Sequence, residues 1–277
     1  MAYLRHLRLG FELTLAPIFL WGALLSGGRW DRGTSAAFLA LHLFLYPAAT
    51  AFNAAFDRDV GPVAGMERPP AVPAHLAAFA IVLALVGALL AAFAGPAFLA
   101  AYAAIVIWTA AYSHPLTRWK GSPWKSALAI ALGQGALGFA AGWIATDGST
   151  GGAGLLALGA AGCALTALGL YPASQVFQVA EDSARGDRTL AVALGPRRAL
   201  RFGTVCLAAA GAVTVWLVLG HFGRPDAVLI ALGFAALIVI NERLARAPDY
   251  RRAMRVLNVA TFAFLLFIAL QAIGGEA

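Results

Sequence analysis

The sequence predicts an all-α membrane protein in which nine transmembrane helices form one bundle. Of its 277 residues, 61% are hydrophobic and only 12% are charged, a composition that a water-soluble domain of this size could not cover with polar surface. The apolar runs are about 20 residues long, the length that a helix needs to cross a bilayer. They are rich in Ala and Leu and lack the alternation of barrel strands, the other structure that spans membranes.

Nine apolar segments follow one another, at residues 11–25, 34–56, 74–94, 97–113, 125–146, 152–180, 199–219, 227–244 and 254–273. The first has no small-residue cleavage site, so we expect it to stay as an anchor. Gly61 and Pro62 are expected to end the second, and Gly95 and Pro96 separate the third from the fourth. Residues 147–151 form a short connection before the sixth, which is long enough to project beyond the bilayer.

Residues 1–277 are expected to form one domain, because no soluble region, low-complexity tail or long linker separates two folding units. Cys163 and Cys206 lie in different spans without metal-ligand spacing, so we interpret both as small core residues. The fifth segment carries a face of small residues, which predicts close helix packing, at Gly133, Gly135, Gly138 and Gly142.

Basic residues are distributed unequally between the two sides of the expected bundle. Seventeen of the twenty Lys and Arg residues fall on the side of the N-terminus, and only Arg29, Arg32 and Arg224 fall on the other. The positive-inside rule therefore predicts an N-in, C-out protein of the inner (cytoplasmic) membrane, and an odd number of spans agrees. The net charge of +7 reflects topology and contact with anionic membrane lipid, so no nucleic-acid partner is expected.

A first polar constellation lies where the second segment ends, on the cytoplasmic side. Asn53 and Asp57 are four residues apart and share a helix face, and Asp59 follows just beyond. An amide and carboxylates therefore emerge together at one end of the bundle. The alternative is that these charges only solvate a helix end.

A second constellation runs down the end of the sixth segment. Tyr171, Gln175, Gln178 and Asp182 are spaced by four, three and four residues, which predicts a polar stripe about three helical turns long. Facing such a stripe toward lipid is costly, so it should point into the bundle or a water-filled cavity. The alternative is a seam of hydrogen bonds between helices.

The two constellations together favour Mg²⁺, which binds oxygen ligands, often one or two carboxylates plus substrate phosphates. Arg118 and Lys120 follow the fourth segment, and Arg188 follows the second acidic group, so a basic collar is in place for a diphosphate. Taken alone, the positive-inside rule also explains these cations.

Over essentially its whole length the chain resembles the UbiA superfamily of membrane prenyltransferases. That family carries an NDxxDxxxD motif after its second helix and a DxxxD motif after its sixth, and Asn53, Asp57 and Asp182 match them. Residues 189–195, TLAVALG, resemble the family's TLAxxLG segment, and residues 112–118 resemble a YxxPLxR loop. The resemblance implies nine membrane helices, an isoprenyl diphosphate bound through Mg²⁺, its ionisation, and transfer of the prenyl group to an acceptor.

The sequence departs from these motifs at three positions. Ala54 and Gly61 replace acids of the first motif, and Gln178 replaces the first acid of the second. Asp59, Glu181 and Asp187 offer carboxylates nearby. These departures suggest a divergent branch in which the number of metal ions is open.

We expect a Mg²⁺-dependent prenyltransferase that transfers the chain of an isoprenyl diphosphate to a hydrophobic, aromatic acceptor, with Asp57 and Asp182 essential for catalysis. The expected metal ligands are Asn53, Asp57, Asp59 and Asp182, with Glu181 and Asp187 as second choices. The expected substrate contacts are Arg118, Lys120, Arg188, Tyr171, Gln175 and Gln178. Two alternatives are a membrane terpene cyclase of the same fold and a non-catalytic lipid-binding or transport scaffold.

Overall fold

The structure, a computed structural model, describes residues 2–146 and 152–274. For Val256 it describes only the backbone. The connection at 147–151 lies outside the described residues. Within the described ranges, nine helical segments are long and apolar enough to cross a membrane, which confirms the predicted fold class. The other regular feature there is an isolated antiparallel bridge between Val63 and Met66.

Three of the nine segments change helix type along their length. The first comprises α1 (Ala2–His6), α2 (Leu9–Glu12), the 3₁₀ turn η1 (Leu13–Leu15) and α3 (Ala16–Leu25). The second comprises α4 (Arg32–Leu39), the π-helix η2 (Ala40–Leu45) and α5 (Tyr46–Asp57). The fifth comprises α8 (Pro123–Ala129), the π-helix η4 (Ile130–Ala136) and α9 (Leu137–Ala145).

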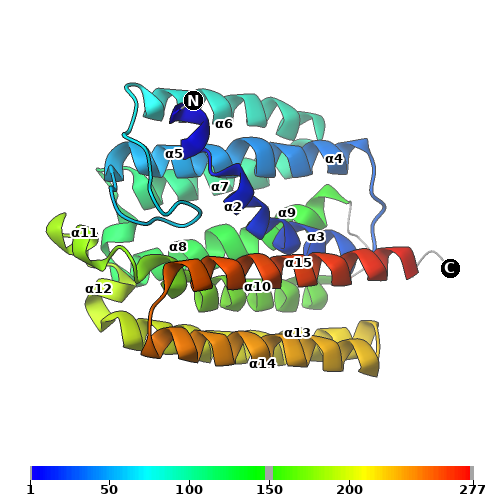
Figure 1. The fold of residues 1–277 in the computed structure, drawn as a ribbon. Coiled ribbons are helices and arrows are strands. Elements are labelled where there is room, and N and C mark those ends of the chain that lie inside the picture. The colour runs from blue at the N-terminus through cyan, green and yellow to red at the C-terminus, as the bar shows by residue number, and fades with distance from the viewer. Residues whose placement is uncertain (1, 147–151, 275–277) are drawn as a thin grey trace.

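The remaining segments are single helices: α6 (Leu76–Phe93), α7 (Pro96–Ser113), α10 (Gly152–Gln175), α13 (Pro196–His221), α14 (Arg224–Arg246) and α15 (Tyr250–Gly274). Three short elements lie in the connections: η3 (Trp119–Gly121), α11 (Val179–Ala184) and α12 (Leu190–Leu194). The long helices run side by side in one bundle (Figure 1). The connection after α5, together with α11 and α12, gathers at one end, and α15 leads to the opposite end (Figure 1).

Glycines allow α3 and α9 to approach until their backbones touch. A Cβ atom on Gly22 would lie 2.1 Å from the carbonyl oxygen of Phe139, and one on Gly142 would lie 1.9 Å from that of Phe19. In the same segment, a Cβ on Gly135 would lie 2.4 Å from the Cα atom of Ala164 in α10. The close packing predicted for this small-residue face is confirmed.

The sixth segment ends earlier than predicted. Helix α10 stops at Gln175 instead of continuing to residue 180, and α11 begins at Val179. At the break, the α-helical hydrogen bond to the fourth preceding residue is replaced by a turn: the Gln178 N–H donates to the Gln175 carbonyl, three residues earlier, at 2.9 Å. The predicted continuous polar stripe is therefore wrong, because Asp182 lies on a separate helix that turns back over the end of the bundle.

The second segment ends at Asp57, one residue beyond its predicted bound at residue 56. The helix is ended not by Gly61 and Pro62, as expected, but by Arg58, which adopts a left-handed conformation (φ 52°). The Arg58 N–H still donates to the Ala54 carbonyl at 3.1 Å, which closes the helix. This reversal carries the chain away from the helix axis directly after the first acid.

Candidate functional site

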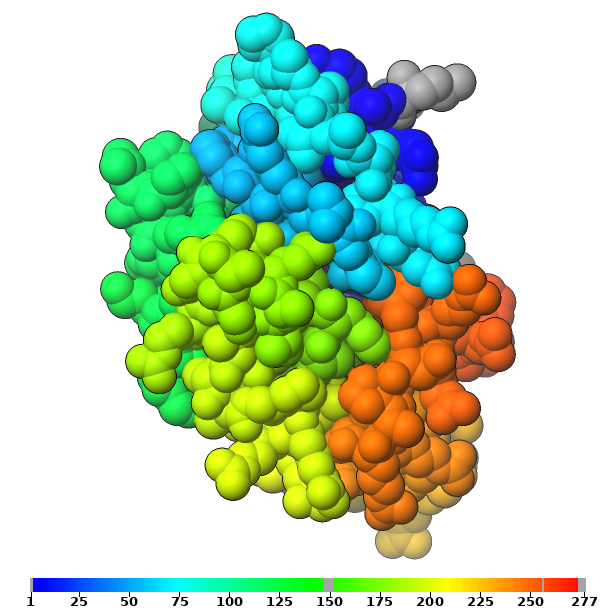
Figure 2. All heavy atoms as spheres, turned by 60° about the vertical axis from the view of Figure 1, so that its left-hand side comes forward, coloured from blue at the N-terminus to red at the C-terminus, as the bar shows by residue number. Residues whose placement is uncertain are grey.

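The candidate site lies at the end of the bundle where α5, α7 and α10 end. Figure 2 shows this end: the yellow-green segment around α11 borders the light-blue end of α5 and the green connection between α7 and α8. Three connections, distant in sequence, therefore supply the side chains.

Asp57 and Asp59 are contributed by the end of α5, where the left-handed Arg58 separates them. Both are buried, at 6% and 8% exposure. Asp57 forms an ion pair with Lys120 and lies 3.6 Å from the guanidinium of Arg118. Its Oδ1 atom is enclosed and accepts no hydrogen bond from any described residue.

The loop that follows α7 orients the side chain of Arg118 toward the aspartates. This residue has a left-handed backbone (φ 37°), and its N–H donates to the carbonyl of His114 at 2.8 Å. Its side chain donates two hydrogen bonds to Asp187, from Nε at 2.7 Å and from Nη2 at 2.6 Å. A bidentate pair of this kind is a strong, directional contact. It joins the α7–α8 connection to the segment after α11.

Arg185 is the hub of the cluster. Its guanidinium donates to Asp59 at 2.6 Å, to Asp182 at 2.5 Å and to Asp187 at 3.4 Å. It also reaches the backbone carbonyl of Asp57 at 3.3 Å. Burial opposes its positive charge, but the surrounding carboxylates outweigh burial and raise the pKa of Arg185.

Sequence reasoning missed Arg185 as a site residue. The available signal was its position in the second constellation, three residues after Asp182 and two before Asp187. That position did not show where the side chain points, and the positive-inside rule explained the residue equally well.

Asp182 and Asp187 differ in proton affinity. Burial opposes ionisation of Asp187, but the hydrogen bond from Arg118 and the charge of Lys120 outweigh it and lower the pKa of Asp187. For Asp182 burial is the larger effect, and it raises the pKa despite Lys120 and Arg185. Asp182 therefore takes up a proton at higher pH than Asp187 does.

Two of the three departures from the family motifs, Gly61 and Gln178, each lie beside an acid supplied by the other connection. The carboxylate of Glu181 accepts a hydrogen bond from the Gly61 N–H at 2.7 Å, and a Cβ atom on Gly61 would lie only 2.9 Å from that carboxylate. Similarly, the amide of Gln178 donates to Asp59 at 3.0 Å. An acid at either replaced position would repel its neighbour, so the replacements convert repulsion between two carboxylates into hydrogen bonds.

A second layer of polar groups lies deeper in the bundle. The hydroxyls of Tyr112 and Tyr171 are 3.0 Å apart, and the Gln175 amide donates to Tyr171 at 2.6 Å. The Oε1 atom of Gln175 is enclosed and accepts no hydrogen bond from a described residue. Asn53 accepts a hydrogen bond from the Ser113 hydroxyl at 3.2 Å, which places it beside the end of α7.

Arg188 is not brought into this cluster. Its side chain is exposed, and its backbone N–H donates to the carbonyl of Gly121 at 3.1 Å. Within residues 2–146 and 152–274, no ion pair joins its guanidinium to a carboxylate. All the other candidate site residues lie in the polar cluster or the layer beneath it.

The chemistry of the cluster fits Mg²⁺. Among the described residues no three acidic, histidine or cysteine side chains converge on one point, because basic residues separate the aspartates. Mg²⁺ does not need three such ligands, since it binds through one or two carboxylates plus substrate phosphates and water. The unbonded Oδ1 of Asp57 is one oxygen available to it.

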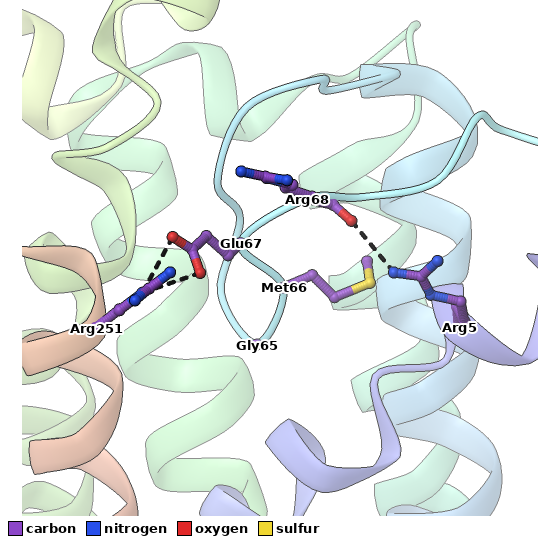
Figure 3. Close-up of a pocket in the computed structure, with 6 residues that line it drawn as sticks. All are labelled: Arg5, Gly65, Met66, Glu67, Arg68 and Arg251. Carbon is purple, nitrogen blue, oxygen red and sulfur yellow. Dashed lines mark hydrogen bonds and ion pairs between the residues drawn. The ribbon is translucent and has the colours of Figure 1, made fainter.

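An open pocket of about 470 Å³ lies between the connection after α5, the last turn of α1 and the start of α15 (Figure 3). Its lining residues are Arg5, Gly65, Met66, Glu67, Arg68 and Arg251. Glu67 pairs with Arg251 at 3.2 Å, and Arg5 donates to the Arg68 carbonyl at 3.4 Å (Figure 3). The connection is thus held from both sides across this end of the bundle.

Comparison with known proteins identifies a matching family and solved structures of the same fold. A model described as the UbiA prenyltransferase family matches residues 15–270. Among solved structures, a UbiA homolog from Archaeoglobus fulgidus bound to GPP and Mg²⁺ is 18% identical, with a TM-score of 0.73 and coverage of 98% of this chain and 99% of that one. The apo UbiA homolog from Aeropyrum pernix K1 is 22% identical, with a TM-score of 0.71 and coverage of 96% and 98%.

A third solved structure, described as digeranylgeranylglyceryl phosphate synthase in membranes, is 17% identical, with a TM-score of 0.64 and coverage of 99% of this chain and 97% of that one. At these identities the likeness establishes the fold. No match was found among curated proteins.

Proposed function

The chain belongs to the UbiA prenyltransferase family, whose members are prenyl-transfer enzymes that release diphosphate, and from this premise we propose its reaction. The protein binds an isoprenyl diphosphate with Mg²⁺, ionises it, and transfers the prenyl group to a hydrophobic, aromatic acceptor. Two solved structures of a UbiA homolog from Archaeoglobus fulgidus are described as bound to GPP and Mg²⁺ and to DMAPP and Mg²⁺, which supports this donor class and metal.

One observation carries the proposal: four buried aspartates from two constellations share their counter-ions. Asp57 and Asp59 come from one connection and Asp182 and Asp187 from another, and Arg185 contacts three of the four side chains. Such a concentration of buried charge costs free energy unless it is paired and hydrogen-bonded. A protein that only needed a solvated helix end would not require it.

The proposed metal ligands are the oxygens of Asp57, Asp59, Asp182, Asp187 and Asn53. Glu181 is a second-choice ligand. When bound, Mg²⁺ would neutralise the diphosphate and stabilise the charge that develops on this leaving group. The aspartates hold the two connections together, so that ligands from both lie at one end of the bundle.

The proposed diphosphate contacts are Lys120, Arg118 and Arg185. Their nitrogen atoms already lie among the carboxylates, where a metal-bound diphosphate would sit, and Arg and Lys are the usual partners of phosphate oxygens. The prenyl chain then extends from this polar end into the apolar interior. An aromatic acceptor suits that interior, because its π electrons can attack an allylic cation without a charged nucleophile.

We place the site on the cytoplasmic side of an inner membrane and treat residues 1–277 as one domain. The supporting observation is the charge distribution, because only three of the twenty Lys and Arg residues fall at the other end.

The test is diphosphate release from C10, C15 and C20 isoprenyl diphosphates by purified protein in lipid nanodiscs. We expect release with Mg²⁺ that stops in EDTA. Asp57→Ala and Asp182→Ala should lower it at least about 100-fold, the scale of a lost electrostatic contact in a transition state, while the exposed Arg197→Ala control retains wild-type activity. Intact donor after incubation with Mg²⁺ would instead indicate a binding scaffold, and a hydrocarbon product without acceptor would indicate a cyclase.

A further inference from the structure

Glu12 is a buried carboxylate that the cluster does not use. It lies in α2, inside the first membrane-spanning segment, and is only 2% exposed. Its Oε1 atom is enclosed and accepts no hydrogen bond within the described residues. Arg8, one turn earlier, acts on it electrostatically, but the Arg8 guanidinium donates instead to the carbonyl of Ala64 at 3.1 Å. A carboxylate left so incompletely satisfied inside a membrane protein marks a functional site.

The backbone around Glu12 is also broken. Arg8 has a left-handed conformation (φ 49°), and a 3₁₀ turn follows α2 before α3 begins. The break frees the carbonyls of His6 and Leu7, which lie 3.3 Å and 3.2 Å from the Thr50 hydroxyl. Non-helical backbone at membrane depth is tolerated only where it is buried in protein or lines a cavity, and strained residues gather at functional sites.

Glu12 faces the same side of α5 that carries the acidic cluster. Tyr46 and Thr50 lie near it, close enough for the charge of Glu12 to act on Tyr46 and for the Thr50 side chain to influence the Glu12 carboxylate. Together with Asn53 and Asp57, they form one face of α5, at intervals of four, three and four residues. Thr50 precedes Asp57 by seven residues, or about 10 Å of helix. Glu12 therefore lies beneath the cluster, on the apolar side, where a prenyl chain would enter from a diphosphate held above.

We infer that Glu12 accepts the proton that the reaction releases, an assignment that rests on the proposed function. The bond between the allylic carbon and its oxygen breaks, and its electron pair leaves on the diphosphate. The acceptor's nucleophilic carbon or oxygen forms a bond to the allylic carbon and loses its proton to Oε1 of Glu12. In the cyclase alternative, the proton is lost from the cyclised cation to the same atom. Among the described residues, Tyr46 and Arg8 are the titratable groups that interact electrostatically with this carboxylate.

The experiment compares Glu12→Gln, which keeps the shape but cannot accept the proton, with Glu12→Asp, which keeps a carboxylate. The matched control is Glu242→Gln, because Glu242 lies in another span and contacts Thr204 and Arg201, far from the α5 face. Nanodisc-embedded proteins receive the C10, C15 and C20 donors with Mg²⁺, with and without 4-octylphenol as the acceptor probe. Mass spectrometry measures two amounts. The first is that of the products whose formation requires loss of a proton to the enzyme, prenylated phenol or hydrocarbon, and the second is that of the prenyl alcohol formed when water captures the cation. The readout is the ratio of the first amount to the second.

We expect Glu12→Gln to keep the wild-type KM for the donor while that product ratio falls at least about 100-fold, the scale of lost general-base catalysis. Glu12→Asp should recover part of the loss, and Glu242→Gln should match wild type. Two results would overturn the inference and leave the proposed function intact. One is a wild-type product ratio in Glu12→Gln, and the other is an equal fall of the product ratio in Glu12→Gln and Glu12→Asp. Absence of diphosphate release from wild-type protein would overturn both.

Discussion

The aspartates of the cluster are each tied to a specific basic partner, and these pairs give the site its order. Asp187 holds Arg118 by two hydrogen bonds, Asp57 holds Lys120, and Asp59 and Asp182 share Arg185. Asp57, Asp59 and Asp187 each pair with a basic residue on a different connection, whereas Asp182 pairs with Arg185 on its own connection, so the removal of one side chain leaves a buried charge elsewhere.

The Arg118–Asp187 pair predicts a pH-dependent stability. The pKa of Asp187 is lowered below its ordinary value of 3.8, so its ionised form stabilises the fold above that value and this contribution is lost as pH falls further. Asp187→Asn should lower the free energy of unfolding by about 1–3 kcal/mol at neutral pH, as expected for a hydrogen bond to a charged group. The difference from wild type should vanish in acid.

Unfolding midpoints measured in detergent with EDTA, across a pH series, check this prediction. The control is Glu67→Gln, which breaks the exposed pair with Arg251 and should cost less than about 1 kcal/mol at any pH. A difference between Asp187→Asn and wild type that persists unchanged at low pH would contradict it.

At the scale of elements, breaks in the helices position the site. The second segment ends at a left-handed Arg58, the sixth ends at Gln175, and the first is interrupted at Arg8. Each break redirects the chain within or beside the polar end of the bundle. Segment hydropathy does not report how the backbone turns at these breaks, because hydropathy depends on side-chain type and not on backbone conformation.

The α3–α9 contact predicts a steep packing penalty. In Gly142→Ala the new Cβ would meet the carbonyl of Phe19, and backbone cannot move aside as a flexible side chain does. The substitution should lower the free energy of unfolding by at least about 2 kcal/mol. Thermal unfolding in detergent measures it.

Gly233→Ala in α14 is the matched control, since a Cβ there meets nothing within 4 Å. Because Ala is the better helix former, this variant should be neutral or more stable by up to about 1 kcal/mol. Equal effects of the two substitutions would refute the packing argument.

At the scale of the whole molecule, the charge distribution predicts the orientation. Arg188→Cys should react with a membrane-impermeant maleimide in inside-out vesicles but not in intact cells, and Arg29→Cys should show the reverse. Both positions are exposed in the structure, whereas the native Cys163 and Cys206 are buried and give little background. Labelling of Arg188→Cys from outside intact cells would reject the proposed N-in topology.

The sequence by itself determined the fold class, the number of spans and the two acidic constellations. These features are local: transfer of about 20 apolar residues into a bilayer is favourable whatever their neighbours, and a motif is readable from its own spacing. Even there, the predicted end of the sixth segment was wrong, because turns that end helices depend on contacts outside the segment.

Only the tertiary structure decided which residues meet. The role of Arg185 as the shared partner, the fit of Glu181 over Gly61, the exposure of Arg188 and the burial of Glu12 beside α5 all depend on how distant helices are arranged. Side-chain direction follows from the packing of the whole bundle, and interactions between charges change steeply with distance and burial. Residues of one type in similar loops therefore acquire different roles, which no local pattern distinguishes.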